Sequence, residues 1–492
     1  MTQAEQAEPP KLSVWTKFVY GLGSASEMVT LAAVGGYAMF FYNQVVGLPA
    51  TLAGLAITVS LVLDGMAEPL VGSLSDRMRS RWGRRHPFMF VGVIPVAICV
   101  VAIFNPPKDL AHIWLFLWFA SFVVTLRIFM AVCHVPHMAL GGELAQGYTE
   151  RSRVMAWNNL LGMIGRASTS FIALSLFFHA TEEYPRGLLN PHAYTPFALS
   201  VAAAGLILLM ISAWFTRHRI PYLPKPPQDL PPFSPFEFFR DMKGAFSNIN
   251  YVWLLVGFFF LSLMLGVREG LNLYINTFFW GFTSEQIRWF VIGTLTGFFV
   301  GFFLTAPIHA RFDKKIAVLV AGAFLAVTPA VPIVLQLNDL MPPADDARLL
   351  PMVIAFAGVS AAAGSVMNIS VMSQLADIAD ENELRFGYRQ EGVLYSTRSF
   401  FAKLDTAIGH LFAGIALDLV AFPERATPGQ VPEETLRALA FVDGPVAAIP
   451  GLIALLFYAR YRITRASYEA TRTRLLDARA ARGGRMVAAP SD

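Results

Sequence analysis

The sequence predicts an all-α membrane protein with about twelve transmembrane helices, arranged in two lobes of six. Of the 492 residues, 55% are hydrophobic and only 15% are charged, whereas a soluble globular protein usually carries about 25% charged residues. The charges gather in short polar segments between long apolar runs, a pattern that a soluble core does not require. The apolar runs reach the roughly 20 residues that a helix needs to cross a bilayer.

Twelve apolar runs are long enough to span the membrane. In order, they lie near residues 17–45, 51–75, 86–104, 111–141, 152–178, 196–216, 248–279, 284–308, 315–336, 349–375, 390–421 and 437–461. We therefore expect an N-terminal lobe at 1–216, a linker at 217–247, a C-terminal lobe at 248–461 and a basic tail at 462–492. The linker is rich in proline, so its first part should be extended and its last part a short amphipathic helix.

Basic residues in the short loops indicate the orientation of the chain, because cytoplasmic loops carry an excess of Lys and Arg. The loops after the second and eighth spans are basic, through Arg77, Arg79, Arg81, Arg84, Arg85, Arg311, Lys314 and Lys315. The loops on the other side are poor in basic residues. Both termini are therefore expected in the cytoplasm. The polar N-terminus lacks the pattern of a cleaved signal peptide.

Two six-helix halves around a linker suit a secondary transporter that binds its substrate near the midplane. The chain has no Walker A motif for ATP-driven transport, and we do not expect an enzyme, although a membrane enzyme or scaffold is the alternative. Cys99 and Cys133 lie inside apolar runs and offer neither a disulfide nor a metal site. The expected partners are a small-molecule substrate, a coupling cation and the bilayer. No cofactor or nucleic acid is expected, and we expect a monomer.

Asp64 and Glu68 are the clearest candidate functional residues. Ionisable residues inside a span are costly and often mark a functional site. A spacing of four places both carboxylates on one face of the second helix. Because two close carboxylates cannot both remain ionised cheaply in low dielectric, they should share a proton or hold a cation. The alternative is that they pair with basic residues to hold helices together. Lys403, in the eleventh span with Arg398, is the candidate partner.

Other intramembrane charges are Arg127, Arg166, Arg268 and Glu269, of which the last two could lie near a membrane face. In the fourth span, His134 is a candidate proton relay or substrate contact. It is three residues from His137, but the sequence shows no third ligand, so a metal site is not expected.

Four stretches in matching order resemble the glycoside–pentoside–hexuronide:cation symporters, a branch of the major facilitator superfamily. These are Tyr20–Thr30, Asp64–Phe88, Val135–Arg153 and Leu375–Ser396. The resemblance implies the major-facilitator-type fold and an inner-membrane carrier. It also implies that Asp64 and Glu68 match the two cation-binding carboxylates of the melibiose carrier and that Lys403 matches the lysine near them. The loop after the second span matches a segment that locks the two lobes, which makes a conformational gate of Asp76, Arg77, Arg81, Gly83, Arg84 and Arg85.

The departures from the melibiose carrier affect the coupling cation. Ala67 stands where that carrier has an asparagine, and Ala131 where it has a threonine. Because sodium requires several oxygen ligands, losing two neutral oxygens favours a proton over sodium.

The departures also affect the substrate. His134 replaces the acidic residue that grips sugar hydroxyls, Met138 replaces a tryptophan, and Met28, beside Glu27, replaces an aspartate. The predicted substrate-binding residues are Glu27, Met28, Arg127, His134, Met138, Asn159 and Arg398. We expect cation-coupled symport of a glycoside-like or related small organic solute. The alternatives are a transporter of amphipathic lipids such as lysolipids, and a non-transporting solute sensor.

Overall fold

The computed structural model describes residues 12–145, 148–223, 246–386, 391–465, 467–475 and 477. Within these ranges, twelve helices are long and apolar enough to cross a membrane. They cover Val14–Val46, Ala50–Arg77, His86–Ile103, His112–Leu144, Thr149–Phe177, Pro191–Tyr222, Ile249–Phe279, Ser284–Arg311, Lys314–Leu337, Leu349–Arg385, Thr397–Leu419 and Glu433–Tyr458. The predicted all-α fold with twelve spans is confirmed.

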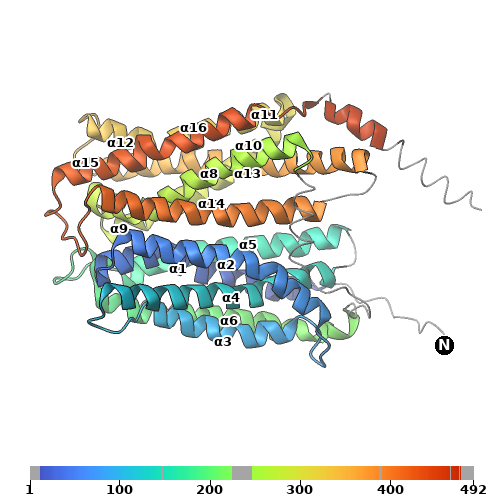
Figure 1. The fold of residues 1–492 in the computed structure, drawn as a ribbon, viewed down its shortest axis with the longest axis horizontal. Helices are drawn as coiled ribbons and strands as arrows, with labels where there is room; N and C mark the ends of the chain where they lie inside the picture. The colour runs from blue at the N-terminus through green and yellow to red at the C-terminus, as the bar shows by residue number, and fades with distance from the viewer. Residues whose placement is uncertain are drawn as a thin grey trace, which may run out of the picture. The chain divides into compact units, whose positions relative to one another are not determined.

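Several spans consist of more than one helical element (Figure 1). The first half contains α1 (Val14–Phe40), η1 (Phe41–Val46), α2 (Ala50–Arg77), α3 (His86–Ile103), α4 (His112–Leu144), α5 (Tyr148–Ile172), η2 (Ala173–Phe177), η3 (Gly187–Leu189), α6 (Pro191–Thr216) and η4 (Arg217–Tyr222). The second half contains α8 (Ile249–Tyr274), η5 (Ile275–Phe279), α9 (Ser284–Ile287), α10 (Trp289–Arg311), α11 (Lys314–Val327), α12 (Ala330–Leu337), α13 (Leu349–Phe386), α14 (Glu391–Leu419), α15 (Glu433–Phe441), η6 (Val442–Val446) and α16 (Ala447–Tyr458).

The chain divides into two compact units. Unit 1 contains the described residues up to 223, Glu269–Val291 and His410–Thr435. Unit 2 contains the described residues from 246 to Arg268, Ile292–Gly409 and those from Leu436 onward. Unit 1 therefore also contains the end of α8, η5, α9, the start of α10 and the last part of α14.

In unit 1, α1 packs against both α5 and α6, while α4 packs against α2 and α3. Glycines permit the close approach of α1 and α5. A Cβ atom added at Gly165 would lie 2.8 Å from the carbonyl oxygen of Ala25, and one added at Gly21 would lie 2.8 Å from that of Trp157. Since real Cβ atoms do not come this close to backbone, a larger residue at either position would push the two helices apart.

In unit 2, α11 packs against α13 and α16. Gly297 and Gly301 of α10 lie directly against the backbone of α13, at Gly358 and Ala362. The hydrophobic core extends from Tyr251 and Met264 of α8 through Met367 of α13 to Tyr458 of α16, all of them buried. This core holds the first part of α14 in place through the buried Leu394.

The helices α1 and α8 end in the same way. Each passes into a π-helical turn, η1 or η5, and then reaches a glycine with positive φ, Gly47 at 87° and Gly281 at 66°. The amide after each glycine bonds the carbonyl six residues earlier, at 2.8 Å for Leu48 to Tyr42 and 2.9 Å for Phe282 to Asn276. This left-handed conformation favours glycine, which has no Cβ atom.

The linker differs from expectation at its start. Residues Arg217–Tyr222 form the 3₁₀ turn η4 that continues α6, and not extended chain. The fixed φ of Pro221 is compatible with such a turn. The rest of the predicted linker, including its expected amphipathic helix, falls at 224–245, outside the described residues, as does the tail after 477.

Candidate substrate and cation site

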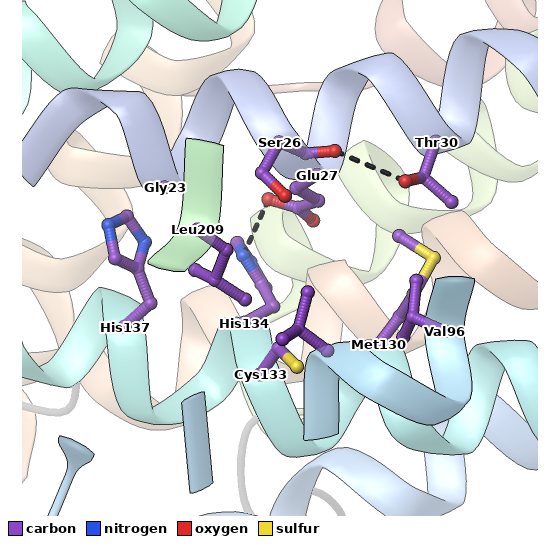
Figure 2. A pocket seen from close by; sticks show the side chains of 11 residues that line it. Gly23, Ser26, Glu27, Thr30, Val96, Met130, Cys133, His134, His137 and Leu209 are labelled. Atoms are coloured by element: carbon purple, nitrogen blue, oxygen red, sulfur yellow. Dashed lines mark hydrogen bonds and ion pairs between the residues drawn. The ribbon is translucent and has the colours of Figure 1, made fainter. Parts of the chain in front are cut away.

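A small cavity lies within unit 1, enclosed by α1, α3, α4 and α6 (Figure 2). Its lining combines polar and apolar side chains from Gly23, Ser26, Glu27, Thr30, Val93, Val96, Met130, Cys133, His134, His137 and Leu209. About 20 Å³ is open to a water-sized molecule. Because one water needs about 10–15 Å³ by this measure, the cavity has room for water and no room for a sugar.

The carboxylate of Glu27 and the imidazole of His134 meet in this cavity. Their atoms Oε2 and Nδ1 lie 2.6 Å apart, with side chains 15% and 27% exposed (Figure 2). Glu27 reaches from α1 and His134 from α4, so the pair joins two membrane-spanning helices. Beside it, the hydroxyl of Ser26 donates to the carbonyl of Gly205 at 2.6 Å. The structure therefore brings together two of the predicted substrate-binding residues.

His137 is held differently from His134, although both lie on α4. Its Nε2 lies 2.8 Å from the carbonyl oxygen of Tyr20, and its ring stacks on the Tyr20 ring with centroids 4.4 Å apart. An added Cβ at Gly23 would collide with this imidazole. His137 is therefore packed between α4 and α1.

Arg127 lies seven residues before His134, on the same face of α4. The structure gives the Arg127 guanidinium no hydrogen bond or ion pair to any described residue, and its Nε atom is buried. It lies within electrostatic reach of His410. The guanidinium of Arg166, by contrast, lies 3.3 Å from the carboxylate of Glu269. Arg127, His410, Arg166 and Glu269 all belong to unit 1.

The remaining predicted substrate contacts in unit 1 point in several directions. Met28 packs toward Gly162 on α5, away from the α4 side that Glu27 faces. Met138 is 37% exposed, and its sulfur accepts a 3.6 Å hydrogen bond from the amide of Asn158. The predicted residue Asn159 is exposed instead. Neighbours on a helix differ by about 100° in direction, so Asn158 and Asn159 face different sides of α5, and the role of Asn159 as a substrate contact stays a prediction.

Asp64 and Glu68 both lie on α2, with Asp64 only 5% exposed and Glu68 half-buried. Their spacing of four residues places them one turn apart on one helix face, as expected. Lys403 and Arg398 lie on α14 in unit 2, and the Arg398 guanidinium stacks 4.4 Å from the centroid of the Phe258 ring. Pairing of Lys403 with the α2 carboxylates stays a prediction.

The predicted gate residues divide into two groups. Arg84 and Arg85 converge on Glu143 at the end of α4, at 2.7 Å and 2.8 Å. Arg85 also lies 2.5 Å from Asp76 and donates to the hydroxyl of Ser75. We call Asp76, Arg84, Arg85 and Glu143 the arginine cluster.

Arg77 and Arg81 are exposed and lie outside this cluster. Gly83 has a φ of 74° and provides the left-handed turn that brings the two following arginines back toward α4. Sequence reasoning missed Glu143, although the only acidic residue in the stretch MALGGEL could have suggested a partner for these arginines.

A second polar cluster at the other end of α2 was not predicted. The Asp418 carboxylate accepts hydrogen bonds from the amides of Ala50 and Thr51, at 3.2 Å and 2.9 Å. Arg425 donates to the carbonyl of Val46. The amide of Gln44 donates to the carbonyl of Pro423, and its oxygen accepts from the amide of Ala426. We call Gln44, Asp418 and Arg425 the backbone clasp.

The twelve spans, the intramembrane carboxylates and the arginine cluster together define a polytopic membrane transporter. A family model described as "MFS/sugar transport protein" matches residues 19–465. The chain belongs to this family, which confirms the resemblance to melibiose-carrier-like symporters.

Relatives cover almost the whole chain. An uncharacterized symporter of Synechocystis is 28% identical, over 96% of this chain and 98% of its own. A putative glycoside/cation symporter of Escherichia coli is 25% identical, over 96% and 97%. A sodium-dependent lysophosphatidylcholine symporter of Gallus gallus is 25% identical, over 95% and 90%.

Solved structures show the same fold. The xylose transporter XylE of Escherichia coli, in a partially occluded inward-open conformation, aligns with a TM-score of 0.57 at 13% identity, over 92% of this chain and 98% of its own. A bacterial homologue of the iron transporter ferroportin aligns with a TM-score of 0.62 at 13% identity, over 91% and 100%.

Proposed function

We propose that this protein is a cation-coupled symporter of a glycoside-like or related small organic solute, with a proton as the favoured cation. The observation that carries the proposal is the pair Asp64 and Glu68, two carboxylates one turn apart on a membrane-spanning helix. Two neighbouring carboxylates inside a membrane bind a proton or a cation because the added positive charge relieves their repulsion. The relative named a glycoside/cation symporter supports the same reading.

The proposed mechanism begins at the carboxylate pair. When a cation binds Asp64 and Glu68, Lys403 is released from them. The solute then contacts Glu27, His134 and Arg127 in unit 1, with Arg398 as a further contact, and the lobes move to expose the site on the other side. The cavity described above has room only for water. In this scheme Glu27 and His134 therefore separate, and each bonds to solute hydroxyls in place of the other. The carrier would act in an inner membrane with both termini cytoplasmic.

The test is uptake into vesicles containing the full chain, driven separately by a proton gradient and by a sodium gradient. We expect Asp64→Asn and Glu68→Gln each to reduce concentrative uptake at least tenfold, while solute exchange stays measurable. Asp345→Asn, at an exposed loop position, is the matched control and should transport normally. Concentrative uptake that survives in Asp64→Asn would contradict the coupling scheme. Uptake driven by sodium alone would contradict the choice of the proton.

A second candidate substrate is a lysolipid, which the relative from Gallus gallus favours by its name. The two substrates can be separated by thermal stability, because a ligand that binds only the folded state raises it by RT ln(1 + [L]/Kd). Neutral glycosides, hexuronides and lysophosphatidylcholine would each be added to the purified carrier. Stabilisation by lysophosphatidylcholine alone would replace the glycoside with the lysolipid.

A further inference from the structure

Asp405 on α14 is a buried carboxyl group for which the proposed transport scheme has no role. The residue has 0% exposure, and neither Oδ1 nor Oδ2 has a hydrogen-bond partner among the residues that the structure describes. The same part of the chain offers it no ion pair. Asp418, thirteen residues later on the same helix, has a carboxylate that accepts from two backbone amides. The contrast shows that α14 can satisfy one acid and leaves the other unsatisfied.

Parts of α8, α14 and α16 that belong to unit 2 lie near Asp405. Glycines bring α8 and α14 together beside it, since an added Cβ at Gly409 would lie 2.6 Å from the Cα of Gly266. On α16, the buried Tyr458 hydroxyl also lacks a hydrogen bond to any described residue, and it lies within electrostatic reach of Asp405 and of Arg398.

The charged groups on α8 and α14 make other contacts. On α8, the guanidinium of Arg268 donates to the carbonyls of Leu325 and Ala326, at 3.2 Å and 2.9 Å. On α14, Arg398 stacks on the ring of Phe258, and Lys403 is only two residues from Asp405, which places it on another side of the helix. The Tyr251 hydroxyl of α8 donates to the carbonyl of Leu394. None of these groups forms a hydrogen bond or an ion pair with Asp405.

A buried ionised carboxylate without hydrogen bonds or a counter-charge from the protein is so poorly solvated that it takes up a proton instead. We infer that Asp405 is a proton-binding site, which holds a proton as a neutral carboxylic acid in the conformation described here. One proton adds to one carboxylate, so the step needs no other reactant. Any conformation that admits water to α14, or brings a cation to the carboxylate, releases that proton. Acid therefore favours the present conformation, whichever solute the carrier moves.

The direct test is the infrared spectrum of the purified full-length carrier at neutral pH, in light and in heavy water. A protonated carboxyl group gives a C=O stretching band that shifts on deuteration, and an ionised one does not. We expect Asp405→Asn to lose one such band and Asp418→Asn, the matched control on the same helix, to keep it. An unchanged band in Asp405→Asn would overturn the proposal. If Asp405→Asn does not fold, Asp405→Glu serves as the second variant. It should keep the band at a shifted frequency, and loss of the band in Asp405→Glu would also contradict the proposal.

The second test is the pH dependence of thermal unfolding. The unfolded chain ionises this carboxyl above about pH 4, whereas the folded chain holds the proton. The contribution of the Asp405 proton to the free energy of unfolding is therefore fully present below that pH and is lost as the pH rises. Replacing Asp405 with Asn removes this contribution, so the Tm of the variant should fall less between pH 6 and pH 8.5 than that of wild type. Parallel Tm curves would contradict the proposal. Neither test involves a solute, so failure here is separable from failure of the proposed symport.

Discussion

The two ends of α2 are held in different ways. At its last turn, the arginine cluster joins charged side chains from α2, the following loop and α4, all within about 70 residues of sequence. At its first turn, the backbone clasp joins side chains to main-chain groups more than 360 residues apart. The difference matters for mutations. Removing one charge from the arginine cluster leaves its buried partners without a counter-charge, whereas removing one side chain from the backbone clasp breaks only the hydrogen bonds of that side chain.

The largest effect is expected at the arginine cluster. Glu143, 10% exposed, faces Arg84 and Arg85, which are 13% and 5% exposed. Glu143→Gln leaves two nearly buried guanidinium groups without their shared carboxylate, and breaking a buried pair in this way costs about 3–5 kcal/mol. The free energy of unfolding of the purified carrier would measure it, with the exposed Glu182→Gln as control. A loss no larger than that of the control would remove the cluster from any role in stability.

A smaller effect is expected at the backbone clasp. The residue before α2 is Pro49, which provides no side-chain cap, so Asp418 acts as the cap from a distant helix. Asp418→Ala should destabilise the carrier by about 0.5–2 kcal/mol, the usual cost of losing an N-cap. The measurement is again unfolding, with Asp345→Ala at an exposed loop as control. If Asp418→Ala cost as much as Glu143→Gln, the proposed difference between the two ends would be wrong.

The smallest effect is expected for Arg166 and Glu269, whose side chains are 63% and 40% exposed at 3.3 Å. Exposed ion pairs contribute about 0–1 kcal/mol. A double-mutant cycle of Arg166→Gln and Glu269→Gln should give a coupling energy in that range, because water in contact with these side chains weakens their attraction. A coupling of several kcal/mol would show that this pair is desolvated in the working protein and resembles the arginine cluster.

The fold could be predicted because each long apolar run in the sequence indicates one membrane-spanning helix. The tenth span was predicted to end at 375, yet it continues to Arg385, because α13 continues through polar residues such as Asp377 and Glu381 that hydropathy does not count. Asp377 bonds Lys314 at 2.8 Å, and Glu381 accepts from Asn248 at 3.0 Å. These bonds explain why so polar a segment stays helical.

The candidate site could be predicted only in part. Glu27 and His134 were predicted as substrate contacts because they stand at or beside positions that the family resemblance assigns to the substrate, but their contact with each other was not predicted. The backbone clasp was not, because a bond from a side chain to a main-chain group leaves no complementary residue in the sequence. The bond from Asn158 to the sulfur of Met138 was not predicted, because composition does not show which way a helix faces. Pairings across α2 and α14, such as Lys403 with Asp64, stay predictions.

The matching ends of α1 and α8 bear on how this chain arose. Each glycine is followed after three positions by the first residue of the next helix, Ala50 after Gly47 and Ser284 after Gly281. Carriers of this kind are built from internal repeats. A turn, a glycine and a spacing shared at the first helix of each half are the pattern that such an internal repeat produces.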